Sequence, residues 1–151
     1  MDKYECYFDA STNKRKKKSG CSFIVIKNDE TIYKKSWKMK INDNNKAERE
    51  ALFQLLIHIQ KNIERKSEIN IYGDACSIIE QIIAHNRKID KTKFLFHELL
   101  NKHKIDLIYI DREMNYMADE LAYEAQLGIY TDEKNNFELI EFNESIRGYE
   151  K

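Results

Sequence analysis

Short runs of β-branched and aromatic residues alternate with longer amphipathic stretches along this chain, a pattern typical of a mixed α/β domain. Three runs near the N-terminus have the character of strands and are separated by polar residues. In the stretches that follow, apolar residues recur every three or four positions, which is the period of a helix. The predicted strands are 4–9, 20–27, 31–39, 69–73 and 105–110, and the predicted helices are 46–62, 77–85, 92–104 and 117–127.

Connecting segments complete this prediction. Residues 10–19 are predicted to form a polar loop, and 28–30 to form a hairpin turn. We expect one domain over 1–128 and a C-terminal tail or edge extension over 129–151. The tail could add an edge strand, pack as a loose arm or fray, and its apolar residues are Phe137, Leu139, Ile140 and Phe142. Hairpin-like strands followed by αβ units predict a mixed sheet with helices on both faces.

Composition narrows the class of protein. The chain has 151 residues, of which 42% are hydrophobic, and equal numbers of basic and acidic side chains. It can therefore bury a core, and it is not a polycation that gathers partners by bulk charge. The charge is uneven, because residues 1–66 carry seven more basic than acidic side chains and include the run Lys14–Lys18. Three widely spaced cysteines and the lack of a long apolar run lead us to expect a cytoplasmic protein without a membrane segment.

Four acidic residues fall at corresponding ends of predicted elements. Asp9 ends the first strand and Asp74 follows the fourth, so a right-handed crossover between them would bring both to one sheet edge. Glu48 continues the apolar stripe of the first helix and so points at the sheet, and Asp119 lies in the first turn of the last helix. Converging carboxylates repel one another and favour hard divalent cations with oxygen ligands.

Around these acids the sequence resembles the four active-site blocks of the type-1 ribonuclease H family. The blocks occur in the family's order, and they are residues 7–11, 44–48, 71–74 and 115–122. The resemblance implies a ribonuclease H-like α/β fold with a five-stranded mixed sheet of order 3-2-1-4-5. It also implies an endonuclease that hydrolyses the RNA strand of RNA/DNA hybrids with two ions, Mg²⁺ or Mn²⁺. The implied metal ligands and catalytic residues are Asp9, Glu48, Asp74 and Asp119.

Further residues in or beside these blocks are candidates for contacts with the hybrid. Asn45 lies three residues before Glu48, where the family has an asparagine that touches the minor groove. The basic run can grip a phosphate backbone. The candidate substrate-binding residues are Ser11, Lys16, Lys17, Asn44, Asn45 and Asn115.

The chain departs from the family pattern in ways that keep other functions open. Ala10 and Ala75 stand where the family usually has glycine and serine, and residues 111–115 contain no histidine, whereas many members carry one on a loop there. The short connection resembles a subgroup that lacks this loop.

One alternative to the nuclease is therefore a catalytically weak domain of the same fold that binds nucleic acid or a partner. Another alternative is a 3′–5′ exonuclease of a related fold. That class resembles this chain less, because its first strand has an Asp-x-Glu pattern where this chain has Asp9-Ala10-Ser11. We expect a monomer, with a dimer formed through the tail as the alternative.

Overall fold

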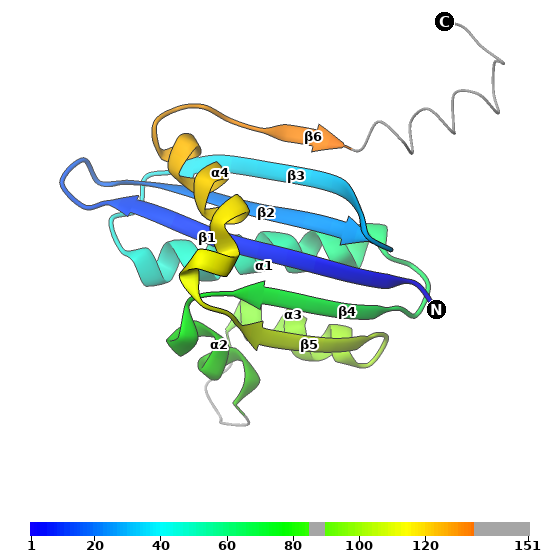
Figure 1. Ribbon diagram of the computed structural model, residues 1–151. Coiled ribbons are helices and arrows are strands. Elements are labelled where there is room, and N and C mark those ends of the chain that lie inside the picture. Colours follow the sequence, from blue (N-terminus) through cyan, green and yellow to red (C-terminus); the bar gives the residue numbers. More distant parts are fainter. Residues whose placement is uncertain (85–89, 135–151) are drawn as a thin grey trace, which may run out of the picture.

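The computed structural model, shown in Figure 1, describes residues 1–84 and 90–134. Its centre is a mixed sheet of six strands in the order β5-β4-β1-β2-β3-β6. The strands are β1 (Lys3–Asn13), β2 (Lys18–Lys27), β3 (Glu30–Met39), β4 (Glu68–Gly73), β5 (Lys104–Tyr109) and β6 (Asp132–Lys134). The helices are α1 (Asn44–Asn62), α2 (Cys76–Ile83), α3 (Lys91–Leu100) and α4 (Tyr116–Gln126), and a short 3₁₀ helix, η1 (Arg112–Asn115), precedes α4.

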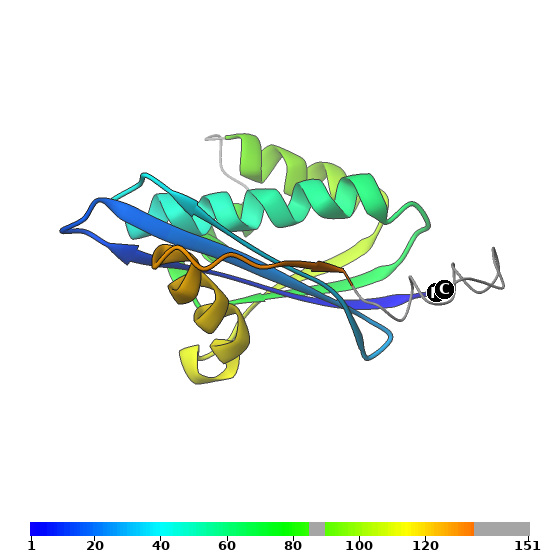
Figure 2. The ribbon, with the colours of Figure 1, turned by 90° about the horizontal axis from the view of Figure 1, so that it is seen from above.

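Helices cover both faces of the sheet, as predicted (Figure 2). On one face α1 buries large aliphatic side chains completely, among them Leu52, Leu55 and Ile59. On the other face α4 approaches the sheet so closely that a Cβ atom at Gly20 would collide with the backbone of α4. The Ser22 hydroxyl donates a hydrogen bond to the Ala118 carbonyl, 2.6 Å away. The small residues Gly20, Ser22, Ala118 and Ala122 therefore allow α4 to pack closely against β2.

The first hairpin is longer than predicted, so the polar loop proposed for 10–19 is wrong. Strand β1 continues to Asn13 and pairs there with Lys18, which leaves four residues at the tip. The tip closes through a hydrogen bond from the Lys16 backbone N–H to the Asn13 side chain (3.1 Å) and a positive φ of 54° at Lys17. Polar residues therefore extend the strands instead of breaking them, because each finds a cross-strand partner.

Helix α1 begins where its capping residues predict. The Asp43 side chain accepts hydrogen bonds from the backbone N–H groups of Asn45 and Lys46, at 2.9 and 3.3 Å. This cap fixes the start of the helix. Because it fixes the first residue of α1, the cap also fixes where Glu48, in the second turn, lies relative to the sheet.

Strand β6 corrects the predicted strand count from five to six. The predicted order of five strands, 3-2-1-4-5, is confirmed, and β6 is added at the edge of β3. A hydrogen bond of 2.7 Å from the Tyr33 hydroxyl to Asp132 holds it there. The part of the tail beyond residue 134 and its predicted apolar residues lie outside the described residues, as does the predicted end of the second helix at His85. The domain boundary at 128 stays a prediction.

Two other sequence expectations can be compared with the structure. All three cysteines are unpaired, with Cys6 and Cys21 buried and Cys76 exposed. Within the described residues, no helix is both long enough and apolar enough to cross a membrane.

Candidate active site

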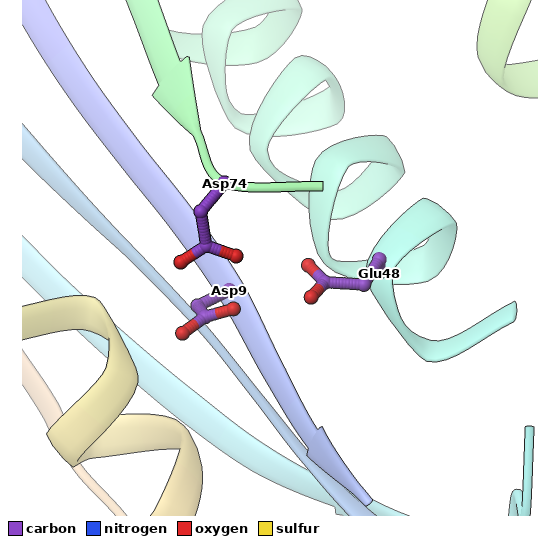
Figure 3. Close-up of side chains that lie close together, drawn as sticks. All are labelled: Asp9, Glu48 and Asp74. Carbon is purple, nitrogen blue, oxygen red and sulfur yellow. The ribbon is translucent and has the colours of Figure 1, made fainter. Parts of the chain in front are cut away.

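Three carboxylates from three different elements converge at one edge of the sheet. Asp9 lies on β1, Asp74 directly follows β4, and Glu48 reaches them from α1. Figure 3 shows their carboxyl groups pointing toward one another, and one oxygen of each lies within 4.8 Å of the others. Strands β1 and β4 are parallel neighbours, with Tyr7 opposite Tyr72, so the two aspartates come to the same edge as predicted. Asp9 and Glu48 are each only 3% exposed.

Burial and mutual repulsion raise the pKa of two of these groups. The pKa of Asp9 rises from 3.8 to about 8, first because the side chain is buried and then because Asp74 lies close by. The pKa of Glu48 is also raised well above its ordinary value by burial and by the charges of Asp9 and Asp74. Burial and mutual repulsion therefore favour the protonated form of these two carboxyl groups when no cation is present.

The residues present fit a divalent cation. The Oε1 atom of Glu48 is buried and has no hydrogen-bond partner among the described residues. A buried acceptor without a donor is unfavourable by about 1–3 kcal/mol, more when the group is charged, so such atoms have a partner that is missing from the bare protein. The donor set consists of carboxylate oxygens, which Mg²⁺ and Mn²⁺ prefer. Asp9, Glu48 and Asp74 are therefore the residues that could hold such an ion.

Asp119, predicted as the fourth ligand, lies beside this group but is not one of the three carboxylates that meet. It projects from the first turn of α4, its side chain is 35% exposed, and it faces the guanidinium of Arg112 at 3.7 Å. Its charge nevertheless contributes to the raised pKa of Asp9. Asp119 is thus near enough to act electrostatically on the site while its own partner is a cation of the protein.

Asn115 occupies a position different from the substrate-facing one that the sequence suggested. It is 1% exposed, and its Nδ2 atom donates to the Phe8 carbonyl at 3.0 Å and to Asp74 Oδ2 at 3.2 Å. Its Oδ1 atom is buried and has no hydrogen-bond partner among the described residues. This side chain therefore ties the start of α4 to β1 and orients Asp74.

The other candidates for substrate contacts surround the carboxylates at the surface. Asn44 and Asn45 are exposed at the start of α1, and Asn44 accepts a hydrogen bond of 3.0 Å from the Thr12 hydroxyl. Lys16 and Lys17 are exposed at the tip of the first hairpin. Asn44 and Asn45 are therefore close in sequence to Glu48, whereas Lys16 and Lys17 lie apart from the carboxylates, at the tip of the hairpin.

Ser11 has a partner that the sequence reading missed. Its hydroxyl accepts a hydrogen bond of 2.9 Å from Gln126, a residue of the last turn of α4 that is 5% exposed. The only sequence signal for Gln126 was its spacing of four residues from Ala122 on the buried stripe of the helix. Gln126 thus fixes the end of α4 to the strand that carries Asp9.

Comparison with protein families identifies the family of this chain. The sequence model of the RNase H family matches residues 1–127, which is most of the chain. The chain belongs to the RNase H family. Its β1, α1, β4 and α4, which carry the four predicted acids, all fall within the matched region.

Solved structures of RNase H proteins share this fold. RNase H1 from the halophilic archaeon Halobacterium salinarum is 20% identical, with a TM-score of 0.70 over 84% of this chain and 99% of that one. LC11-RNase H1, isolated from compost by a metagenomic approach, is 25% identical, with a TM-score of 0.70 over 85% of this chain and 98% of that one. The same LC11 protein has been solved in complex with an RNA/DNA hybrid, and that structure is 21% identical, with a TM-score of 0.67 over 83% of this chain and 97% of that one. A search of curated proteins finds no match to this chain.

Proposed function

We propose that this RNase H chain is an endonuclease that hydrolyses the RNA strand of RNA/DNA hybrids with the help of two divalent ions, Mg²⁺ or Mn²⁺. The observation that carries the proposal is the group of three converging carboxylates with an unpartnered Glu48 oxygen at its centre. Family membership and the hybrid-bound LC11 structure support the choice of substrate.

Each acidic residue has a proposed role that follows from its position. Asp9, Glu48 and Asp74 bind the ions, and Asp119 completes the site when its pairing with Arg112 is released. A pair of bound divalent ions supplies Lewis-acid stabilisation of the attacking and leaving oxygens in an in-line displacement at phosphorus. Asn115 holds Asp74 in place, and because it is buried, its role is positioning.

The substrate is held, in this proposal, by the polar surface around the carboxylates. Asn44 and Asn45 lie exposed at the start of α1, where amide groups can reach the 2′-hydroxyls that distinguish RNA from DNA. Ser11 contributes from β1, two residues after Asp9, and Lys16 and Lys17 contact the phosphate backbone from the hairpin tip.

No histidine lies in the connection between β5 and α4, where η1 makes a single short turn. We propose that the chain belongs to the subgroup of the family that works without the histidine loop. The same observation favours a second candidate, a catalytically weak domain that binds nucleic acid without turning it over efficiently.

A cleavage assay separates the two candidates. The purified chain, with Mg²⁺ or Mn²⁺, should cut a hybrid labelled at the 5′ end of its RNA strand and leave single-stranded RNA and the DNA strand intact. Chelation of the metal should stop cleavage, and Asp9→Asn should abolish it, whereas Asp106→Asn, an exposed acid on β5, should leave it unchanged. Tight binding of the hybrid without cleavage in either metal would establish the binding domain instead.

Two further expectations concern the whole molecule. We propose that it acts as a monomer in the cytoplasm, where unpaired cysteines such as exposed Cys76 stay reduced. Sedimentation of the full chain with and without residues 129–151 would reveal a dimer formed through the tail.

A further inference from the structure

A groove of about 420 Å³ lies between the end of β3 and the first half of α1, on the flank of the helix opposite Glu48. Trp37 and three lysines (Lys35, Lys38 and Lys40) line its β3 side, and Glu50 and Gln54 line its α1 side. We propose that this groove binds single-stranded nucleic acid, with a base stacked on Trp37 and the neighbouring phosphates on the three lysines. The proposal does not depend on hydrolysis at Asp9.

Among the described residues, the lysines that line the groove have no ion-pair partner. Within residues 1–84 and 90–134, Lys35, Lys38 and Lys40 form no ion pair. The one acid in the lining, Glu50, is already engaged, since Lys91 lies 3.3 Å from its Oε1 atom and Gln54 donates to its Oε2 atom at 2.9 Å. The lining of the groove therefore includes three lysines without an ion pair among the described residues, and its one acid is engaged, which suits a chain of phosphates.

The positive field continues from the groove toward the first hairpin. Loss of solvation, and then the charges of Lys38 and Lys16, lower the pKa of Lys18. Lys38 is opposite Gly20 on β2, two residues from Lys18, so these two lysines lie near each other at the same end of the sheet.

Trp37 supplies the second half of the recognition chemistry. Its ring is half-buried and meets Phe23 edge to face, with centroids 5.9 Å apart at 68°. This contact props the indole in one orientation. No described residue accepts a hydrogen bond from its N–H, although the ring borders the groove. Aromatic rings next to unpaired cations are the usual platform for single strands, because every base has a face that stacks.

The groove lies close to the carboxylate edge. Asp9 on β1 is opposite Ser22 on β2, which is opposite Ser36 on β3, and Trp37 comes next. Two strand spacings separate Ser36 from Asp9, about 10 Å. Strands β1 and β3 run in the same direction, so the end of β3 and the carboxylates share one edge of the sheet (Figure 1). A single strand that continues from a duplex at the carboxylates could reach Trp37 within a few nucleotides.

The chain contains one tryptophan, so its fluorescence reports on this groove alone. The full chain should be titrated with an end-labelled oligodeoxythymidylate, following the emission of Trp37 and the anisotropy of the label together. We expect saturable quenching that tracks the anisotropy. With three phosphate contacts, the logarithm of the affinity should fall with the logarithm of salt concentration with a slope of about −2. Binding without any change in Trp37 emission would refute the proposal, as would the absence of binding.

Charge variants test the lysines. The triple variant Lys35→Gln, Lys38→Gln, Lys40→Gln should weaken oligonucleotide binding roughly tenfold or more and bring the salt slope close to zero. Its matched control is Lys66→Gln, Lys102→Gln, Lys104→Gln, which removes the same charge from exposed positions at the opposite edge of the sheet. The control should keep the slope of the unmodified chain. Equal losses in both variants would show that only net charge matters and would overturn the assignment to the groove.

A polyanion without bases tests the stacking. Inorganic polyphosphate should bind more weakly per phosphate than the oligonucleotide and leave Trp37 emission nearly unchanged. If it displaces the oligonucleotide with equal affinity per phosphate, the groove does not recognise a base. Cleavage of a blunt hybrid by the same preparations is a separate readout, so failure of either proposal leaves the other measurable.

Discussion

Two glutamates of α1, only two residues apart, show how differently one helix can treat the same side chain. Glu50 on the outer flank has both carboxylate oxygens engaged, one by Lys91 and one by Gln54. Glu48 on the inner flank is 3% exposed, lies among other acids and has one buried oxygen without a hydrogen-bond partner in the described part of the chain. Protein groups therefore bind both carboxylate oxygens of Glu50, whereas one oxygen of Glu48 is available to a ligand.

The same contrast separates the other acids of the candidate site. Asp74 accepts a hydrogen bond from Asn115, and Asp119 faces Arg112. Asp9 and Glu48 form no ion pair among the described residues, and burial and the charges of neighbouring acids raise the pKa of both. The degree to which the protein neutralises each acid therefore indicates how much each one depends on a bound metal ion.

Exchanging each glutamate of α1 for glutamine should give the largest difference. Glu48→Gln removes a metal ligand, so hydrolysis should fall by more than the roughly 10- to 100-fold loss typical when a group that only supports a ligand is changed. Glu50→Gln removes one partly exposed ion pair outside the candidate site and should leave the rate within about twofold. Steady-state cleavage of a labelled hybrid at several Mg²⁺ concentrations measures both.

Stability of the two variants supplies the control. In chelator, Glu48→Gln should be at least as stable as the unmodified chain, because it removes a buried charge next to Asp9. Denaturant unfolding measures this directly. If Glu50→Gln lost as much activity as Glu48→Gln, the contrast between the two flanks would be mistaken.

The pH dependence of stability is the next largest effect. The pKa of Asp9 is about 8 in the folded protein and ordinarily 3.8. Between these values the folded chain binds more protons than the unfolded chain, so stability falls as pH rises, by at most about 1.4 kcal/mol per unit. From pH 6 to 8 in chelator, the loss should be on the order of 2 kcal/mol, and saturating Mg²⁺ should abolish it because the ion takes the place of the proton.

Asp9→Asn isolates this effect from other titrating groups. The difference in unfolding free energy between the unmodified chain and Asp9→Asn, measured from pH 5 to 9 in chelator, should turn against the unmodified chain as pH rises. A difference that stays constant over this range would mean that Asp9 is ionised throughout and that the repulsion at the site is small.

Asn115→Ala should have an intermediate effect, because it removes the support of a ligand and not the ligand itself. Loss of its hydrogen bonds to Phe8 and Asp74 should reduce stability by about 1–3 kcal/mol and hydrolysis by roughly 10- to 100-fold. Asn101→Ala, at the exposed end of α3, is the matched control and should change neither. A loss confined to hybrid affinity, with the turnover number kept, would instead place Asn115 in contact with the substrate.

Much of this contrast was accessible from the sequence. The parallel pairing of the strands that end in Asp9 and Asp74, and the apolar stripe that includes Glu48, depend on local periodicity and on the handedness of crossovers. Both are strong rules, so the convergence of three acids was confirmed. The order of the five predicted strands came from the resemblance to the ribonuclease H family, and the structure confirms it.

The remaining details depend on contacts between residues distant in sequence. The partner of Asn115 is 41 residues away and that of Gln126 is 115 residues away, so neither could be deduced from neighbours along the chain. Glu50, in the lining of the groove beside Trp37, has its ion-pair partner Lys91 41 residues away. Strand β6 was only one of three alternatives for the tail, because three charged residues have no strand pattern of their own and are ordered by the edge of β3.

Substitution of Arg112 should have the smallest effect of these variants, and it tests whether Asp119 must be released from Arg112. Its side chain is 79% exposed and lies 3.7 Å from Asp119, and exposed pairs of this kind contribute at most about 1 kcal/mol. Arg112→Ala should leave stability nearly unchanged. Because it frees Asp119 from a competing cation, the Mg²⁺ concentration for half-maximal activity should fall, by less than about fivefold. Arg112→Lys, which keeps the charge, should behave like the unmodified chain in a metal titration of hybrid cleavage. A rise in the metal requirement, or a large loss of rate at saturating Mg²⁺, would mean that Arg112 serves the substrate and that Asp119 does not depend on its release.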